Sequence, residues 1–85
     1  MNMAHPGELL RDELVARGWS QTYFARLIRR PVRLVCEIVN AKKSITAATA
    51  LQIGEALGTS PELWATLQMK YDLYKAEVER LKGAK

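Results

Sequence analysis

Signals for the start and end of helices follow one another along this whole chain, and no segment shows the alternation of polar and apolar residues typical of a β-strand. Ser20, Thr46 and Ser60 are residue types that cap the N-termini of helices. Gly18 and Gly58 are of the type that ends helices. Because 85 residues leave no room for two independent cores, we expect one all-α domain over residues 1–85.

Five helices are expected between these signals, over residues 5–18, 20–28, 31–40, 46–58 and 61–82. Arg29 and Arg30 form a short break between the second and the third. Ala25 is expected where these two helices cross, since a small side chain allows close approach. Apolar residues at helical spacing predict the buried faces of the first four helices. These residues are Leu10, Leu14, Phe24, Leu27, Ile28, Val35, Ile38, Val39, Ala50, Leu51, Gly54 and Leu57.

The last helix carries an apolar stripe whose members alternate at spacings of three and four residues, as in a coiled coil. The stripe consists of Trp64, Leu67, Tyr71, Tyr74, Val78 and Leu81. Its first three residues are expected to pack on the core of the domain. The stripe is longer than so small a domain covers, so we expect Tyr74, Val78 and Leu81 to form the interface of a homodimer. The alternative is a frayed or folded-back tail.

The positive charge is concentrated in one part of the chain. The formal net charge is +4, and residues 20–43 contain six basic residues and one acidic residue. A localised basic stretch indicates a surface that binds nucleic acid, the alternative being a solvated basic face. The stretch falls on two short helices joined by a tight turn. The sequence therefore predicts a helix-turn-helix over residues 20–40, whose second helix enters the major groove of double-stranded DNA.

Residues on and after the second of these helices are candidates for contact with DNA. Arg33 can contact guanine with two hydrogen bonds, and Glu37 can accept one from cytosine. Alternatively, the two side chains pair with each other across one helical turn. Val32 and Leu34 are expected to be exposed and to touch thymine methyl groups. The candidates for contact with the phosphates that pass the end of this helix are Asn40, Lys42 and Lys43.

Several short motifs support a more specific expectation. Those around the predicted helix-turn-helix are Ser20-Gln21-Thr22, Phe24-Ala25-Arg26, Glu37-Ile38, Asn40, Lys42 and Ile45-Thr46. Together they resemble the Xre/lambda-repressor-like superfamily. Two further motifs resemble HigA-type antitoxins within it: His5-Pro6-Gly7-Glu8-Leu9-Leu10, and Thr59-Ser60-Pro61-Glu62-Leu63-Trp64 followed by Leu67-Gln68 and Tyr71-Asp72-Leu73. This resemblance covers residues 5–74.

The resemblance implies a five-helix, lambda-repressor-like domain with a long C-terminal helix, a homodimer on a palindromic operator, and a cognate toxin that is usually a small ribonuclease. It also implies that Gln21 donates to a DNA phosphate. The chain departs from the family where Arg29 and Ala41 occupy positions at which glycine is common. A non-glycine residue is strained at a positive φ, so we expect an altered turn at Arg29.

The function expected from these features is that of a cytoplasmic, sequence-specific antitoxin that represses its own toxin–antitoxin operon. The alternatives are a stand-alone transcriptional regulator without a toxin, and a protein-interaction module with a weakened DNA face. Neither enzymatic activity nor a cofactor is expected, because no nucleophile with a base and no phosphate-binding loop is present. The single residues His5 and Cys36 predict no metal site. No membrane helix is expected, since no apolar run exceeds three residues.

Overall fold

The computed structural model describes residues 4–83, and that part of the chain contains five α-helices and no strand. The helices are α1 (Pro6–Arg17), α2 (Gln21–Leu27), α3 (Val32–Val39), α4 (Ala47–Leu57) and α5 (Pro61–Gly83). The predicted all-α fold is therefore confirmed, with boundaries that differ by only one or two residues from those expected. No helix within residues 4–83 combines the length and the apolar character required to cross a membrane.

Side chains cap the N-termini of four of these helices. In each case the side chain accepts a hydrogen bond, 2.9–3.2 Å long, from a backbone N–H two or three residues further on. The capping residues are His5, Ser20, Thr46 and Ser60. Only α3 begins without a side-chain cap, at Pro31. The caps predicted from the sequence are confirmed, and they explain why the helix starts were readable from the sequence.

Helices α1 to α4 end in one common geometry, with a single residue in the left-handed backbone conformation. These residues are Gly18, Arg29, Ala41 and Gly58, with φ of 69°, 57°, 61° and 71°. The next backbone N–H then bonds to the carbonyl five residues before it. The expectation of an altered turn at Arg29 is wrong, because the turn keeps the positive φ that glycine normally provides.

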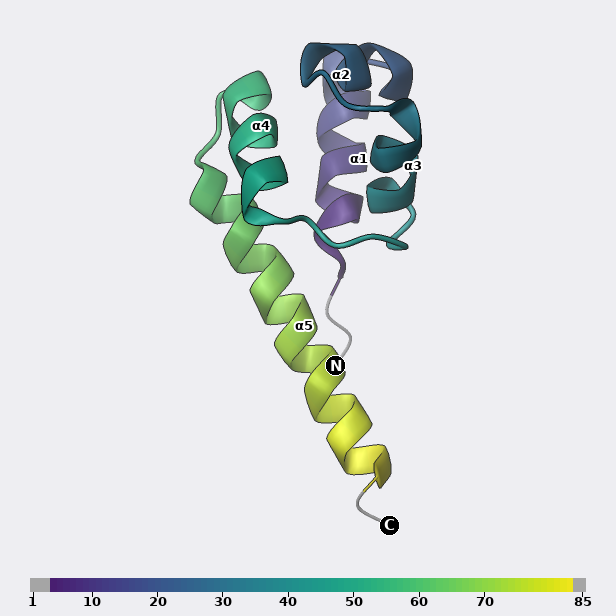
Figure 1. The fold of residues 1–85 in the computed structure, drawn as a ribbon, viewed down its shortest axis with the longest axis vertical. Coiled ribbons are helices and arrows are strands. Elements are labelled where there is room, and N and C mark those ends of the chain that lie inside the picture. The colour runs from purple at the N-terminus through teal and green to yellow at the C-terminus, as the bar shows by residue number, and fades with distance from the viewer. Residues whose placement is uncertain (1–3, 84–85) are drawn as a thin grey trace.

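The core lies between α1, α2, α3, α4 and the first turns of α5 (Figure 1). Phe24 and Trp64 are fully buried in it, and Ala25 is buried at the crossing of α2 and α3 as predicted. Two expected core residues lie on the surface instead: Leu27 is 43% exposed and Leu51 is 60% exposed. Leu27 directly precedes the buried Ile28, and Leu51 directly follows the buried Ala50. Each therefore lies about 100° around its helix from that buried neighbour.

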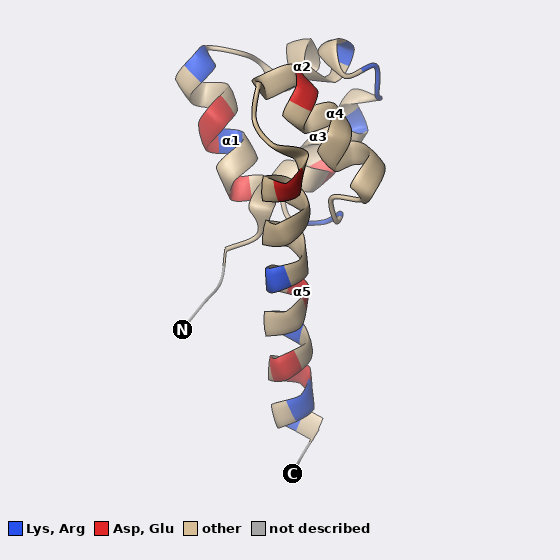
Figure 2. Ribbon diagram, turned by 90° about the vertical axis from the view of Figure 1, so that its left-hand side faces the viewer, with Lys and Arg blue, Asp and Glu red and all other residues tan. Residues whose placement is uncertain are grey.

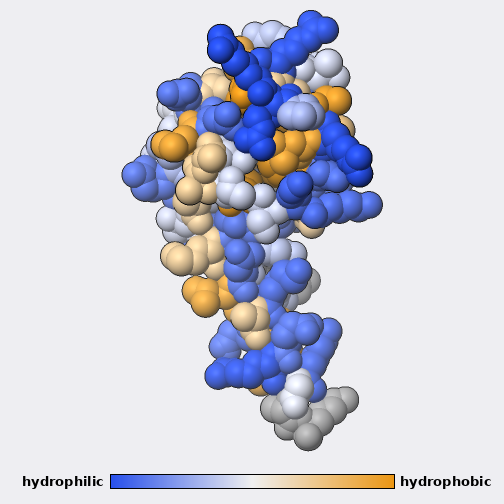
Figure 3. All heavy atoms as spheres, in the orientation of Figure 1, coloured by the Kyte–Doolittle hydropathy of each residue, from blue (hydrophilic) through white to orange (hydrophobic). Residues whose placement is uncertain are grey.

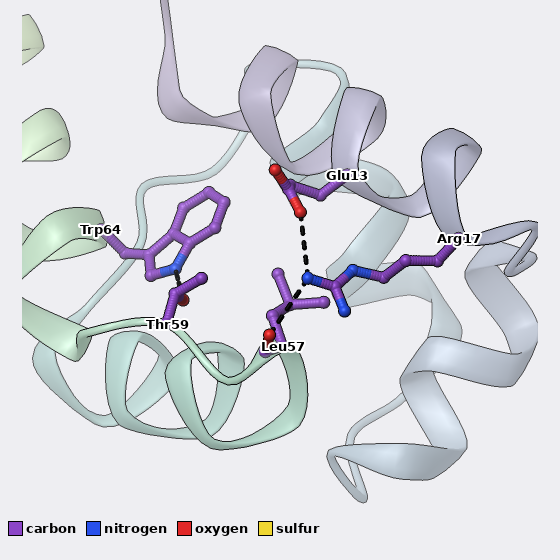
Figure 4. Close-up of polar contacts among 5 residues, drawn as sticks. All are labelled: Glu13, Arg17, Leu57, Thr59 and Trp64. Atoms are coloured by element: carbon purple, nitrogen blue, oxygen red, sulfur yellow. Dashed lines mark hydrogen bonds and ion pairs between the residues drawn. The ribbon is translucent and has the colours of Figure 1, made fainter.

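Two contacts tie the helices together tightly. Gly7, at the start of α1, lies so close to α3 that an added Cβ would meet the carbonyl oxygen of Ile38 at 1.9 Å. On the other side of the core, the indole N–H of Trp64 donates to the hydroxyl of Thr59 at 2.9 Å (Figure 4). These contacts fix α1 against α3 and the base of α5 against the α4–α5 turn.

Arg17 joins α1 to the end of α4. Its guanidinium donates to the carbonyl of Leu57 at 3.0 Å and pairs with the Glu13 carboxylate at 3.1 Å (Figure 4). The carbonyls at the end of a helix have no partner within it. Arg17 therefore satisfies one of these groups in α4 while it holds two helices in place.

The second half of α5 projects from the domain as a single helix (Figure 1). On the face shown in Figure 3, hydrophobic residues reach the surface about midway along it, and hydrophilic residues dominate towards its end. This projection gives the molecule extents of 46 × 21 × 21 Å.

Candidate nucleic-acid interface

Helix α3 has one buried face and one exposed face. On the exposed face, Val32 is 42% exposed and the side chain of Arg33 is 86% exposed. The opposite face belongs to the core and consists of Leu34, Val35, Ile38 and Val39. A helix with this division can rest on the domain and still present side chains to a partner.

Leu34 departs from its prediction. Its exposed fraction is 9%, so the expectation of an exposed side chain is wrong, and little of its surface is available to a thymine methyl group. It precedes Ile38 by four residues and therefore lies on the same stripe of α3. Val32, in contrast, has the exposure that was predicted for it.

Arg33, Glu37 and Lys43 form a row of charges on the outer side of α3. The Nε of Arg33 donates to one carboxylate oxygen of Glu37 at 3.4 Å. The Nζ of Lys43 lies 4.0 Å from the other oxygen of the same carboxylate. Exposed ion pairs of this kind add little to the stability of the fold. An incoming anion can therefore replace the Glu37 carboxylate with little loss of stability. In the isolated chain, Glu37 is thus paired with both Arg33 and Lys43.

Basic residues flank α3 at both ends (Figure 2). Arg29, Lys42 and Lys43 are exposed, whereas Arg30 is half-buried. Arg30 donates to the side-chain oxygen of Gln52 in α4 at 3.0 Å, so it joins the turn before α3 to the rest of the domain. The exposed positive charge is thus placed before, on and after α3.

Asn40 and Gln21 lie at helix ends. The side-chain N–H of Asn40 donates to the carbonyl of Cys36 at 2.9 Å, and its side-chain oxygen accepts from Arg11 at 3.3 Å. Asn40 lies directly after α3, as predicted, and its two hydrogen bonds link the end of that helix to α1. Gln21 is the first residue of α2 and is half-buried.

Comparisons with known proteins place this geometry in a family. No family model matches the sequence. Virulence-associated protein I of Dichelobacter nodosus is 36% identical over 81 residues, which cover 94% of this chain and 75% of that protein. An addiction module antidote protein of a HigA family from Coxiella burnetii is 35% identical, with a TM-score of 0.85 and coverage of 100% and 97%. Antitoxin HigA of Pseudomonas aeruginosa, solved with the higBA promoter, is 34% identical, with a TM-score of 0.92 and coverage of 96% and 90%.

The chain belongs to the HigA family of antitoxins. The resemblance expected from the opening motif and from the Ser-Pro-Glu-x-Trp motif is therefore confirmed. Both motifs have structural roles in this HigA-family domain. His5 caps α1, and Ser60 caps α5, whose Trp64 is fully buried.

In this HigA-family chain, the residues of the apolar stripe of α5 become more exposed towards the end of the helix. Trp64 is buried, Leu67 and Tyr71 are half-buried, and Leu81 is 68% exposed. Tyr74 and Val78 are half-buried on the projecting half of the helix.

The sequence did not draw attention to a second apolar pair on α5. Met69 and Leu73 are 59% and 60% exposed, and they lie about half a turn around the helix from the predicted stripe. Their four-residue spacing was the available signal, but the longer stripe on the other side dominated the pattern.

Gln68 appeared in the sequence only as part of a motif, and no role was predicted for it. It is 5% exposed and hydrogen-bonds the backbone of the loop that follows α3. A polar residue four positions after Trp64, on the buried side of α5, was the signal that could have found it. Within residues 4–83, no group of three or more His, Cys, Asp or Glu is placed to bind a metal ion.

Proposed function

We propose that this chain is a DNA-binding antitoxin that represses its own toxin–antitoxin operon and neutralises the ribonuclease toxin encoded beside it. The proposed activity is binding rather than catalysis, and it takes place in the cytoplasm, where the operator is. The partners are a palindromic operator in double-stranded DNA, a second copy of the chain and the toxin.

The observation that carries DNA binding is the placement of exposed positive charge around α3. Arg33 projects from the outer face of the helix, and its exposed pair with the Glu37 carboxylate is one that a DNA phosphate or base can replace. Basic residues precede and follow the helix (Figure 2), and Arg29, Lys42 and Lys43 among them are exposed. A recognition helix needs side chains that reach base edges and flanking cations that reach phosphates. The structure of the related Pseudomonas aeruginosa HigA with the higBA promoter supports the same assignment.

On this proposal the side chains that meet DNA are drawn from a short set. Val32, Arg33 and Glu37 face the bases, and Gln21, Asn40, Lys42 and Lys43 face the phosphates on either side. Leu34 is not among them, because it is buried in the core. The bonds that Asn40 makes to Arg11 and Cys36 restrict its reach, so we assign it the smallest share of the contact.

Pairing of two chains follows from the needs of operator recognition. A single helix-turn-helix makes few contacts, and a dimer must place its two recognition helices about 34 Å apart to meet successive major grooves. The projecting half of α5 offers Tyr74, Val78 and Leu81 for this purpose. Leu81 is 68% exposed in the single chain, and burial of such a side chain against a partner is favourable.

Footprinting of the protein on its own promoter tests the proposal. We expect one protected palindromic site, and the affinity for it should fall steeply as the salt concentration rises. The reason is that lysine and arginine side chains that bind phosphates release counterions from the DNA. Absence of protection at low salt would favour the interaction module with a weakened DNA face. Protection together with a harmless neighbouring gene product would favour the stand-alone regulator.

A further inference from the structure

The segment between α3 and α4 holds two of the proposed phosphate contacts in a defined backbone shape. Its first turn is closed by the N–H of Lys42, which donates to the carbonyl of Glu37 at 2.7 Å. Its far end is closed by Thr46, the N-cap of α4. Between these points Lys42 and Lys43 are exposed, whereas Ile45 is 4% exposed. The segment therefore points its cations outward and one apolar side chain inward.

Gln68 of α5 holds the middle of this segment. Its side-chain oxygen accepts the backbone N–H of Ile45 at 2.8 Å. Its side-chain nitrogen donates to the carboxylate of Asp72, one turn further along α5, at 3.0 Å. The second bond fixes which end of the amide faces Ile45. Gln68 is 5% exposed, so water does not readily replace it as the partner of that N–H.

His5 approaches the same segment from α1. Its ring lies edge-on to Tyr71 of α5, with centroids 4.9 Å apart, and it faces the backbone of Lys43. The segment thus lies between the first and the last helix. The side chain that bonds to its backbone is the buried amide of Gln68, which does not lie on the exposed face of α3.

We propose that Gln68 is a positioning residue for DNA binding, which holds residues 42–45 in the shape that presents Lys42 and Lys43 to the phosphates. Without its oxygen, the N–H of Ile45 is left buried without a partner, and the segment must shift to satisfy it. Lysine side chains are flexible, so the path of the backbone decides where their ammonium groups are concentrated. This inference rests on the proposed function, since it concerns contacts to DNA.

The central test replaces Gln68 with methionine, which has similar volume but cannot accept the bond. For Gln68→Met we expect a loss of about tenfold in operator affinity and a similar loss for unrelated DNA. The slope of log affinity against log salt should become shallower by about 1 to 2, the equivalent of one or two phosphate contacts. Thr66→Met, at an exposed position on the same helix, is the control and should change neither quantity.

A double-mutant cycle separates positioning from a general structural effect. In a Lys42→Ala/Lys43→Ala background, Gln68→Met should have almost no further effect on affinity or slope, because the groups it positions are gone. The pair Gln68→Glu/Asp72→Asn keeps both hydrogen bonds with the same net charge, and it should restore most of the salt slope. Amide exchange at Ile45 should be fast in Gln68→Met and slow in the rescued pair.

The outcomes distinguish this inference from the proposed function. If wild type binds no DNA, the proposed function fails. If wild type binds and Gln68→Met has the same effect with and without the two lysines, Gln68 is structural only and the inference is overturned. If Gln68→Met does not fold, Asp72→Ala decides, because this change to an exposed residue releases the Gln68 amide without altering a buried side chain, and Asp12→Ala, at another exposed position, is the control for the lost negative charge. A smaller loss of slope supports the inference, and an unchanged slope overturns it.

Discussion

Arg29 and Ala41 occupy equivalent positions at the ends of α2 and α3, each with a left-handed backbone, φ 57° and 61°. Gly18 and Gly58 have the same conformation at the ends of α1 and α4. Both helices of the helix-turn-helix therefore end at a residue with a Cβ, whereas the helices on either side end at glycine. A Cβ in this conformation is destabilising by about 1 kcal/mol or more. The strain therefore lowers the stability of the fold at both ends of the turn-and-helix unit that contains α3, the proposed recognition helix.

Replacing Ala41 with glycine should stabilise the protein. We expect Ala41→Gly to raise the free energy of unfolding by roughly 1 kcal/mol, because glycine adopts the left-handed conformation without strain. Urea unfolding at equilibrium measures the change. The matched control is Gly18→Ala, which should lower the free energy by a similar amount because of the positive φ at Gly18. No atom lies within 4 Å of the added Cβ, so a clash does not contribute. A destabilised Ala41→Gly variant beside a destabilised control would contradict the interpretation.

Arg33 and Lys42 should affect DNA binding in different ways. Arg33→Ala should weaken operator binding by about 1–3 kcal/mol and relax the preference at one base pair, as expected for a base contact. Lys42→Ala should weaken binding to all sequences alike and make the salt slope shallower by about 1. Lys70→Ala, which removes a positive charge from the exposed side of α5, is the control. Equal behaviour of all three variants in titrations against operator and scrambled DNA would point to net charge alone.

The two apolar sides of α5 can be compared directly as dimer interfaces. Tyr74→Asp/Val78→Asp should give a folded monomer with operator binding reduced much more than helix content. Met69→Asp/Leu73→Asp, about half a turn away on the same helix, should leave the dimer intact. Analytical ultracentrifugation and circular dichroism at micromolar concentration decide between them. A wild-type monomer would reject pairing through α5, and dissociation caused only by the second pair would move the interface to the opposite side.

His5 should make stability depend on pH. Burial lowers the pKa of its imidazole below the ordinary value near 6.5, and the carboxylates of Asp72 and Glu8 oppose this only in part, while Lys75 adds to it. The folded chain therefore binds fewer protons than the unfolded chain just below pH 6.5. The contribution of neutral His5 is fully present above that pH and is lost as the pH falls through the lowered pKa.

The measurement is the free energy of unfolding of wild type between pH 5 and pH 8. His5→Asn is the control, because asparagine also caps helices but does not titrate in this range. The variant should be less stable at pH 8 and should show a smaller decline on acidification. An identical pH profile for both proteins would show that His5 does not titrate differently on folding.

The toxin is tested genetically. Expression of the neighbouring gene alone should arrest growth, and co-expression with this chain should restore growth and yield a complex that co-purifies. Arg33→Ala should still rescue growth if the toxin and the DNA use separate surfaces of the antitoxin. Rescue without a complex would indicate that repression alone protects the cell.

The starts and ends of helices could be predicted from the sequence because each depends on one or two local residues. Ser20, Thr46 and Ser60 cap their helices as expected, and the turn at Gly18 has the expected positive φ. The local pattern was less informative within short helices. In α3, Leu34 and Val35 are both buried, because an eight-residue helix packed on both α1 and α2 has a wide buried face.

The candidate site could be predicted only as far as it depends on exposed residues of one segment. The basic character of residues 20–43 identified the region, and Arg33 is exposed on α3 as expected. A polar residue at position 68, on the buried side of α5, was visible in the sequence, but the role of Gln68 was not, because it depends on a contact 23 residues away. Only the packing of α5 against the segment after α3 brings this side chain to the N–H of Ile45.

The projection of α5 gives small changes at its base a large mechanical effect. The part of the helix beyond Gln68 is about 22 Å long at about 1.5 Å per residue, so a tilt of about 10° moves its far end by about 4 Å. One base-pair step along DNA is about 3.4 Å. In the proposed homodimer, the hydrogen bond from Trp64 to Thr59 lies close to the base about which such a tilt would occur. A tilt there would change the distance between the two proposed recognition helices by an amount comparable to one base-pair step.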